Sequence, residues 1–188
     1  CLLLMTGETN GLLMTELFMN ERETLKTLTA KELACFFSLF IDCSSQPISY
    51  LPIDATINHS NSVIRDLSQR VFAMMIEIED EEYRQHFGFV SNWNVSLIMP
   101  EITEEWYSCE CLQEIQETLD THDIFVGNFL KSMIQLDNMI RELIQLCQVI
   151  QAYTVVTTLE QIHEHIYKDM SVEELRDYVR EIIKEFVD

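Results

Sequence analysis

The sequence predicts an all-α fold, a helical bundle of about seven or eight helices that includes one long central helix. Glycine and proline, with 4 and 3 copies, are too few for a turn-rich β fold. Apolar residues make up 47% of the chain and recur in most segments with the period of one helix face. Three such segments follow a Ser or Thr with the capping-box spacing that opens helices: Thr29–Glu32, Thr158–Gln161 and Ser171–Glu174.

The first half of the chain is predicted to hold three helices and one loop. A short helix covers residues 12–20, and a second runs over residues 29–40 from the first capping box. Residues 43–60 hold two of the three prolines and many small polar residues, which indicates a loop. A long helix follows over about residues 60–87, and Gly88 after its acidic end is a stop signal.

The second half of the chain is predicted to hold the longest helix. A short helix at about residues 94–99 is expected to end at Pro100, and an acidic helix is expected over residues 104–119. The longest helix covers about residues 123–153. Two further helices, opened by the second and third capping boxes, are expected between residues 158 and 188.

The charge of the chain excludes several classes of partner. Asp and Glu number 32 against 12 Lys and Arg, a formal net charge of −20, so broad electrostatic binding to nucleic acid or to an anionic membrane is not expected. No apolar run approaches the roughly 20 residues that cross a bilayer, and no signal-peptide pattern opens the chain. The six cysteines show no paired framework, and Cys35 and Cys147 fall in apolar helical pattern, where a free thiol is the ordinary state. We therefore expect an intracellular protein, in the nucleus or the cytoplasm, without a membrane partner.

Motifs of catalysis and of metal or phosphate binding are absent from the sequence. There is no G-x-x-x-x-G-K-[ST] and no other Gly-rich loop. CEC at residues 109–111 and HEH at residues 163–165 look like metal motifs, but residues two apart on a helix point about 200° apart and cannot chelate one ion. No Ser–His–Asp or Cys–His pattern stands out. We expect no catalytic site, cofactor or metal in these 188 residues.

The longest predicted helix is neutral although the chain is strongly acidic. Residues 126–151, VGNFLKSMIQLDNMIRELIQLCQVIQ, contain two acids and two bases. The preceding residues 101–123 carry eight acids and no Lys or Arg. The acidity therefore stops where this helix begins, while the acidic runs themselves are expected to be solvated faces.

The polar side of this helix is built largely from uncharged side chains. At about 100° per residue, Lys131, Gln135 and Asn138 share one face with Glu142, and Asn128 lies at the edge of that face. The opposite face is apolar, with Phe129, Met133, Ile140, Leu143, Cys147 and Ile150. Two interpretations remain open from the residues alone. The polar face meets only water or neighbouring helices, as most such faces do, or it contacts an anionic strand without repelling it.

Three blocks of the sequence resemble the DSHCT domain, the C-terminal helical domain of superkiller-like and exosome-associated DExH-box RNA helicases. Residues 13–40, LMTELFMNERETLKTLTAKELACFFSLF, are similar to the opening "LTELLF" and "L-x-P-E-E-x-A-A-L-L-S-x-F" stretches of that family. EEWYSCECLQEI is similar to "Y-x-W-A-x-G-x-S-F-x-E-I", and GNFLKSMIQLDNMIRELIQL to "G-x-L-I-R-x-x-R-R-L-x-E-L-L-x-x-L". The positions in register are Thr15, Glu16, Leu17, Leu28, Glu32, Ala34, Ser38, Phe40, Trp106, Leu112, Glu114, Ile115, Gly127, Lys131, Leu136 and Leu143.

The resemblance implies a role in a larger, ATP-dependent machine. In such helicases two RecA-like domains, upstream and absent here, bind ATP and Mg²⁺, and the helical domain closes over the exit of the nucleic-acid channel. A long "ratchet" helix there lies against the translocating strand, and the third block matches it. The expected contacts with single-stranded RNA, weak and local, are Lys131, which matches an Arg of the family, then Gln135, Asn138 and Asn128. The RecA-like domains and a protein of an RNA-decay complex are the other expected partners. Since the chain begins with Cys1 rather than Met, we expect it to be a piece of a longer protein.

Departures from the family pattern indicate a divergent member, such as a viral or protist one. Cys109 replaces a glycine, and Ile134 and Gln135 replace paired arginines. The motif resemblance ends near Thr157, so we expect a DSHCT-like domain over residues 1–156 and a helical extension over residues 157–188 that packs on it.

Three further expectations come from the same sequence. Trp106 is expected to anchor the core, and Gly127 to be a helix start or a close-packing position. The alternative function is a stand-alone acidic helical module for protein–protein interaction. An upstream reading frame with G-K-[ST] and D-E-x-H would decide between the two functions.

Overall fold

The computed structural model describes residues 8–41, 55–84, 95–110 and 112–166. These residues contain eight helices and no strand, which confirms the predicted all-α fold. None of these helices is both long and apolar enough to cross a membrane. The helices are α1 (Glu8–Asn20), α2 (Arg22–Leu25), α3 (Ala30–Ser38), α4 (Ser62–Arg84), α5 (Met99–Ser108), α6 (Leu112–Thr121), α7 (Val126–Val149) and α8 (Tyr153–His165).

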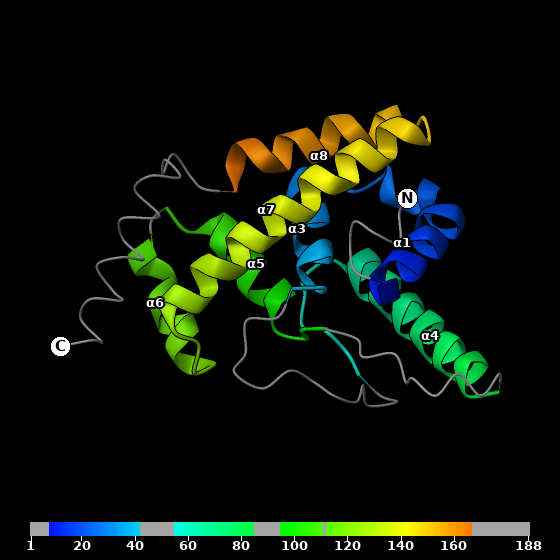
Figure 1. Cartoon of the computed structure of the whole chain (residues 1–188). Coiled ribbons are helices and arrows are strands. Elements are labelled where there is room, and N and C mark those ends of the chain that lie inside the picture. The colour runs from blue at the N-terminus through cyan, green and yellow to red at the C-terminus, as the bar shows by residue number, and fades with distance from the viewer. Residues whose placement is uncertain (1–7, 42–54, 85–94, 111, 167–188) are drawn as a thin grey trace.

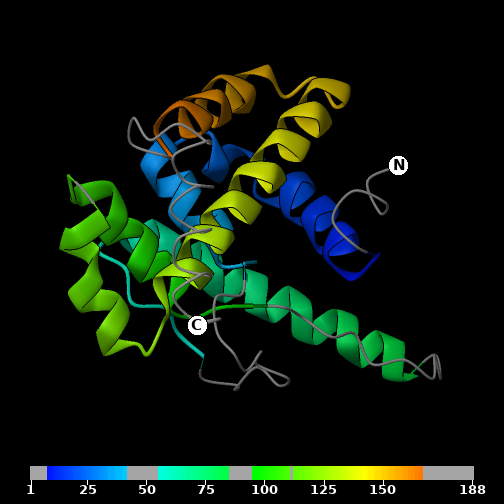
Figure 2. The same ribbon diagram turned by 60° about the vertical axis from the view of Figure 1, so that its left-hand side comes forward.

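Helix α3 lies at the centre of the bundle, and α7 crosses it (Figure 1). Helix α3 contacts α4, α5, α7 and α8, and α8 folds back beside α7. Helices α5 and α6 gather at one end of α7, and α1 lies towards the other, as the rotated view also shows (Figure 2). The long helix thus spans the described part of the bundle with one side on α3 and α8 and the other side outward.

The sequence of α3 explains both its start and its central position. Thr29 Oγ1 accepts a hydrogen bond from Glu32 N (3.3 Å), and Glu32 Oε2 accepts one from Thr29 N (2.8 Å), so the predicted capping box is confirmed. Every residue from Leu33 to Ser38 is buried. The rings of Phe36 and Phe37 meet edge to face at 5.3 Å, and a helix buried on all sides needs neighbours on all sides.

A buried carboxylate joins α7 to α8. Asp137 is 3% exposed, and its Oδ2 accepts a hydrogen bond from Arg141 Nε at 3.0 Å. His163 Nδ1 of α8 lies 2.6 Å from Asp137 Oδ1. The turn between the two helices places Gln151 in the left-handed region (φ 57°), and Ala152 N donates to Cys147 O at 2.7 Å, the bond that closes a Schellman-type helix end.

Trp106 is a core anchor, as predicted. It is 2% exposed, and its ring meets Phe129 of α7 edge to face, with centroids 5.5 Å apart. Its Nε1 donates a hydrogen bond to the carbonyl of Ile166, the residue after α8, at 2.9 Å. One side chain of α5 therefore holds both helices of the α7–α8 pair.

Two predictions for the middle of the chain are wrong. Residues 95–98 are not helical, and Pro100 lies in the first turn of α5 rather than after a helix. Proline fits there because backbone N–H groups in the first turn of a helix have no partner within the helix. The single helix over residues 104–119 is two helices. Cys109 is extended (ψ 155°), and Glu114 Oε2 accepts a hydrogen bond from Glu110 N at 2.7 Å, ahead of α6.

Two predictions for the second half of the chain also need correction. Helix α7 is shorter than the predicted residues 123–153. Asp123 (φ 54°) adopts the left-handed backbone that ends α6, and Gln151 (φ 57°) adopts the one that ends α7. The capping box at Thr158 is wrong, since α8 begins at Tyr153 and Thr158 Oγ1 donates to Thr154 O inside it. The capping box at Ser171 and the stop at Gly88 lie outside the described residues. The boundary after residue 156 falls within α8, and the division of the chain there stays a prediction.

Replacing Trp106 with Phe should lower the free energy of unfolding by about 1–3 kcal/mol, because the buried carbonyl of Ile166 loses its donor. Urea unfolding followed by circular dichroism measures this difference. Tyr83→Phe, at an 81% exposed ring, is the control and should leave stability unchanged. Equal stability of both variants would contradict the anchoring role.

Candidate nucleic-acid interface

The four predicted contact residues lie together on the outward side of α7. Asn128, Lys131, Gln135 and Asn138 are all exposed, and their spacing places them along one helix face. We call these four residues the α7 stripe. Among the described residues, none forms a hydrogen bond or ion pair with a side chain of the stripe.

The opposite face of α7 is apolar and buried almost as predicted. Phe129, Met133, Ile140, Leu143 and Cys147 are each at most 1% exposed. The exception is Ile150, which is 37% exposed because α7 has ended at Val149. Gly127 lies at the helix start, as expected, where an added Cβ would come within 2.8 Å of the half-exposed Phe125 ring.

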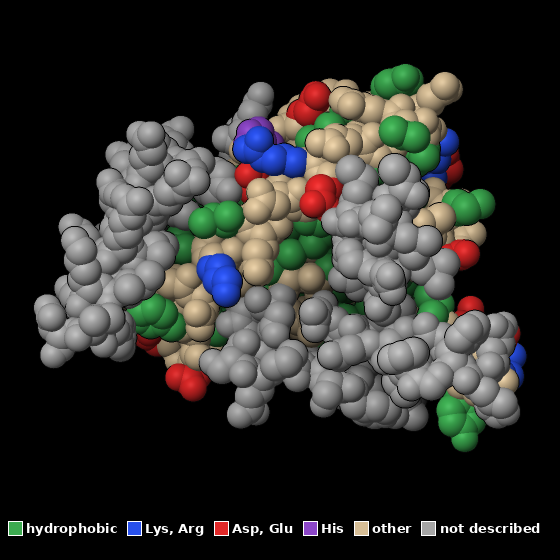
Figure 3. Space-filling model, in the orientation of Figure 1, with side chains coloured by type: hydrophobic (Ala, Val, Ile, Leu, Met, Phe, Trp, Pro, Cys, Tyr) green, Lys and Arg blue, Asp and Glu red, His purple; other side chains and the backbone are tan. Residues whose placement is uncertain are grey.

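The two acids of α7 differ in their surroundings. Asp137 is buried between Arg141 and His163. Glu142 is half-buried, and burial raises the pKa of its carboxyl group. Figure 3 shows mainly uncharged polar and hydrophobic side chains along α7 on this side, with charged ones at intervals.

Of the eight acids that precede α7, five are exposed and two contact an earlier segment of the chain. Glu110, Glu114, Glu117, Asp120 and Asp123 are exposed, as the expected solvated face requires. Glu101 and Glu104 are not simply solvated, because they hold the segment at residues 55–61. Glu101 accepts a hydrogen bond from Asn58 Nδ2 at 2.8 Å, and Glu104 accepts one from Ser60 N at 3.0 Å.

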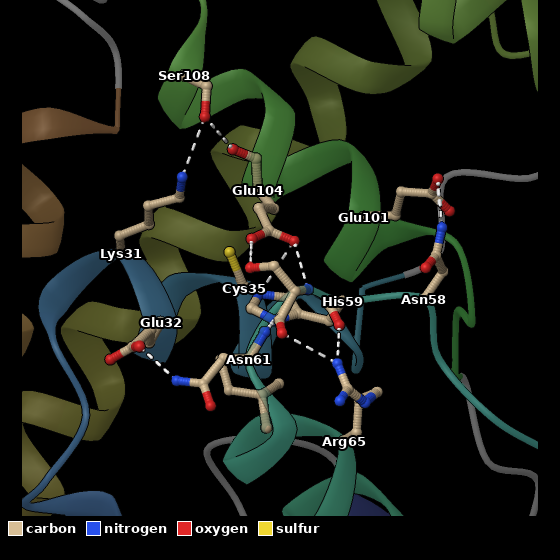
Figure 4. A network of polar contacts seen from close by, with 12 residues as sticks. Lys31, Glu32, Cys35, Asn58, His59, Asn61, Arg65, Glu101, Glu104 and Ser108 are labelled. Carbon is tan, nitrogen blue, oxygen red and sulfur yellow. Dashed lines mark hydrogen bonds and ion pairs between the residues drawn. The ribbon is translucent and has the colours of Figure 1, made fainter.

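A second polar cluster, centred on His59, was not anticipated from the sequence (Figure 4). His59 is 5% exposed, its Nδ1 accepts a hydrogen bond from Asn61 N at 3.0 Å, and its Nε2 lies 3.6 Å from Glu104 Oε2. The Asn61 side chain donates to Glu32, and its Oδ1 caps α4 by accepting from Val63 N at 2.8 Å. The cluster therefore fastens α3, α4 and α5 together.

The electrostatics of this cluster favour a structural role. Burial is the largest influence on His59 and lowers its pKa. Burial raises the pKa of Glu104, but the hydrogen bonds from Ser60 together with nearby His59 and Lys31 outweigh it, so the net pKa is lowered. Nearby Cys35 is fully buried, and burial raises the pKa of its thiol to about 12, so it is not a nucleophile. The sequence signal for this cluster is the polar run His59–Ser60–Asn61 ahead of an apolar helix. The sequence alone does not show that Glu32 and Glu104 contact this run.

Acid should destabilise the chain through His59. Its pKa is lower in the folded chain than the ordinary value of 6.5, so the unfolded chain binds the proton more tightly. This contribution to stability is complete above pH 6.5 and is lost as the pH falls towards the folded pKa. Between about pH 7.5 and 5.5, urea unfolding should show a larger loss of stability for the wild-type chain than for His59→Gln. Parallel curves for the two proteins would contradict this assignment.

Two further observations concern cysteines and metal ligands in the described residues. Cys35 and Cys147 are free thiols, as expected. Within the described ranges no three His, Cys, Asp or Glu side chains gather in a way that could hold a metal ion.

Comparison with known proteins identifies the family of the chain. No curated protein matches the sequence. The model of one domain family, the DSHCT (NUC185) domain, matches residues 5–173, which include all eight helices and extend past the point where the motif resemblance ends. This domain is associated with superkiller-like helicases. With nearly its whole length matched and an all-helical structure, the chain belongs to the DSHCT (NUC185) domain family.

Proposed function

We propose that the chain is the C-terminal helical domain of an ATP-dependent, superkiller-like RNA helicase. In this role α7 guides single-stranded RNA at the channel exit, and the bundle braces the RecA-like domains of the same protein. The observation that carries the proposal is the α7 stripe, an exposed face of three carboxamides and one lysine in a chain of net charge −20. Family membership supports the helicase context and does not favour a stand-alone interaction module.

The chemistry of the stripe suits a strand that must move. Carboxamides of Asn128, Gln135 and Asn138 can hydrogen-bond phosphates, sugars and bases without repelling them. Lys131 adds one charge that any phosphate can meet, independent of base sequence. Contacts of this kind hold a strand weakly, so it can advance without a large barrier at each step.

The geometry of the bundle supports the same role. The stripe extends from Asn128 to Asn138, about 15 Å along the helix axis at 1.5 Å per residue. Its backing is rigid, because Phe129 and Met133 are buried and Asp137 joins α7 to α8. A rigid helix keeps its polar side chains at constant positions while the RecA-like domains move.

ATP chemistry belongs to the RecA-like domains in this proposal. They would bind ATP and Mg²⁺, since the present sequence has no phosphate-binding loop. A protein of an RNA-decay complex is a further proposed partner, and the proposed location is the nucleus or cytoplasm.

The chain alone should bind labelled single-stranded RNA weakly, with an affinity that falls as salt rises, by roughly 0.7 log units per log unit of salt for each phosphate contacted. Fluorescence anisotropy from low to physiological salt measures this. Lys131→Glu should abolish the binding, and Arg84→Glu, at the far end of α4, should not. Equal loss in both variants would indicate non-specific attraction, and binding retained in Lys131→Glu would place RNA on another surface.

In the full-length helicase, a triple variant of the stripe should lose unwinding and keep ATP turnover. The variant is Lys131→Glu, Gln135→Glu and Asn138→Glu, which lowers the net charge by four units where the strand would pass. The control variant is Ala73→Glu, Ile76→Glu and Arg84→Glu, which changes the charge equally on exposed positions of α4.

Duplex unwinding and RNA-stimulated ATP hydrolysis are measured for both triple variants. Unchanged unwinding in the stripe variant would remove α7 from the path of the strand. Loss in both variants would mean that negative charge anywhere on the domain is harmful.

A further inference from the structure

A pocket opens beside the C-terminal end of α7, away from the α7 stripe. It has a volume of about 310 Å³ and lies between α1 and α7. Its lining is mostly apolar: Thr15, Phe18, Met19, Arg22, Leu146 and Ile150. Pockets of this size accept large apolar side chains.

Large apolar side chains are exposed around this pocket. Met19 is 75% exposed, Val149 81% and Tyr153 63%, and Ile150 in the pocket wall is 37% exposed. In Figure 3 hydrophobic side chains gather at this end of the molecule, over α1 and the turn from α7 to α8. Clustered apolar surface around a pocket is typical of protein interaction sites, whereas single exposed apolar residues are ordinary.

Arg22 gives the pocket a positively charged group that favours a carboxylate. Its Nη2 donates to the carbonyl of Gln151 at 3.3 Å, and its Nε is buried without an acceptor. Its acidic neighbours are engaged elsewhere, Glu21 by Arg70 at 2.7 Å and Glu23 by Lys26 at 2.5 Å. In the part of the chain that the structure describes, no carboxylate lies within ion-pair distance of the Arg22 guanidinium. An external carboxylate is the group that this arginine fits best.

We propose that this pocket docks a segment of a partner protein that inserts a large apolar side chain and places an Asp or Glu carboxylate against Arg22. The apolar side chain supplies the buried area, and the ion pair sets the orientation of the segment. Arg22 attracts the acidic side chain of the segment locally, against the overall negative charge of the chain. The inference is independent of RNA guidance, because it uses none of the four stripe residues.

Selection from a phage library of random peptides of about twelve residues, against the whole 188-residue chain, tests the proposal. Enriched sequences should pair a large apolar residue with a nearby Asp or Glu. A synthetic peptide of the enriched sequence should bind about tenfold more weakly to Arg22→Gln and to Ile150→Ser. Gln keeps a donor for the Gln151 carbonyl, so the local fold is retained. Ile76→Ser is the matched control, because Ile76 (38%) and Ile150 (37%) are equally exposed, and it should change affinity less than about twofold.

Four outcomes would overturn the proposal. The first is no enrichment, and the second is enriched peptides that lack an acid or bind Arg22→Gln as tightly as wild type. The third is a dimer of the chain that Ile150→Ser dissolves, which would make a second copy the occupant. The fourth is tighter peptide binding after removal of residues 1–7, which would make the chain's own N-terminal segment the occupant.

Discussion

The bundle depends on the burial of the last six residues of α3. Its residues Leu33 to Ser38 are all buried, and Phe36 and Phe37 have no exposed surface. Burying each such ring contributes about 1.5–3 kcal/mol, so the helix is stable only when other helices cover every side of it. Helices α4, α5, α7 and α8 provide that cover. The later helices therefore take positions that cover the apolar residues of α3.

The outward face of α7 is a consequence of that packing. Because α7 buries Phe129, Met133 and Ile140 against the bundle, the residues on its other side must face outward. Asp137 is drawn inward, where it pairs with Arg141 and contacts His163, so its carboxylate does not lie on the face proposed to meet a phosphate strand. The contact with His163 also joins α7 to α8. Stability and the proposed contact with RNA thus share one set of interactions.

The two proposed binding surfaces, which lie towards opposite ends of α7, differ in the interactions that they offer. In the proposal, the polar stripe near its N-terminal half holds the strand weakly, as a sliding contact requires. The pocket near its C-terminal end is apolar with one arginine, as a lasting and oriented contact requires. The net negative charge of the chain would keep both contacts local, because it repels nucleic acid and acidic segments from the rest of the domain.

The sequence by itself determined the helical class, the cap of α3, the burial of Trp106 and the polar stripe of α7, because each depends on local spacing or on periodicity. Tertiary structure decided where some helices begin and which distant residues meet. Thr29 and Thr158 carry equivalent capping patterns, yet only Thr29 begins a helix, since the turn at Gln151 already starts α8 five residues before Thr158. The His59 cluster and the contact of Arg22 with Gln151 join segments far apart in the chain. Such contacts exist only after the bundle has assembled, because nothing in the local sequence specifies which distant residue will arrive beside them.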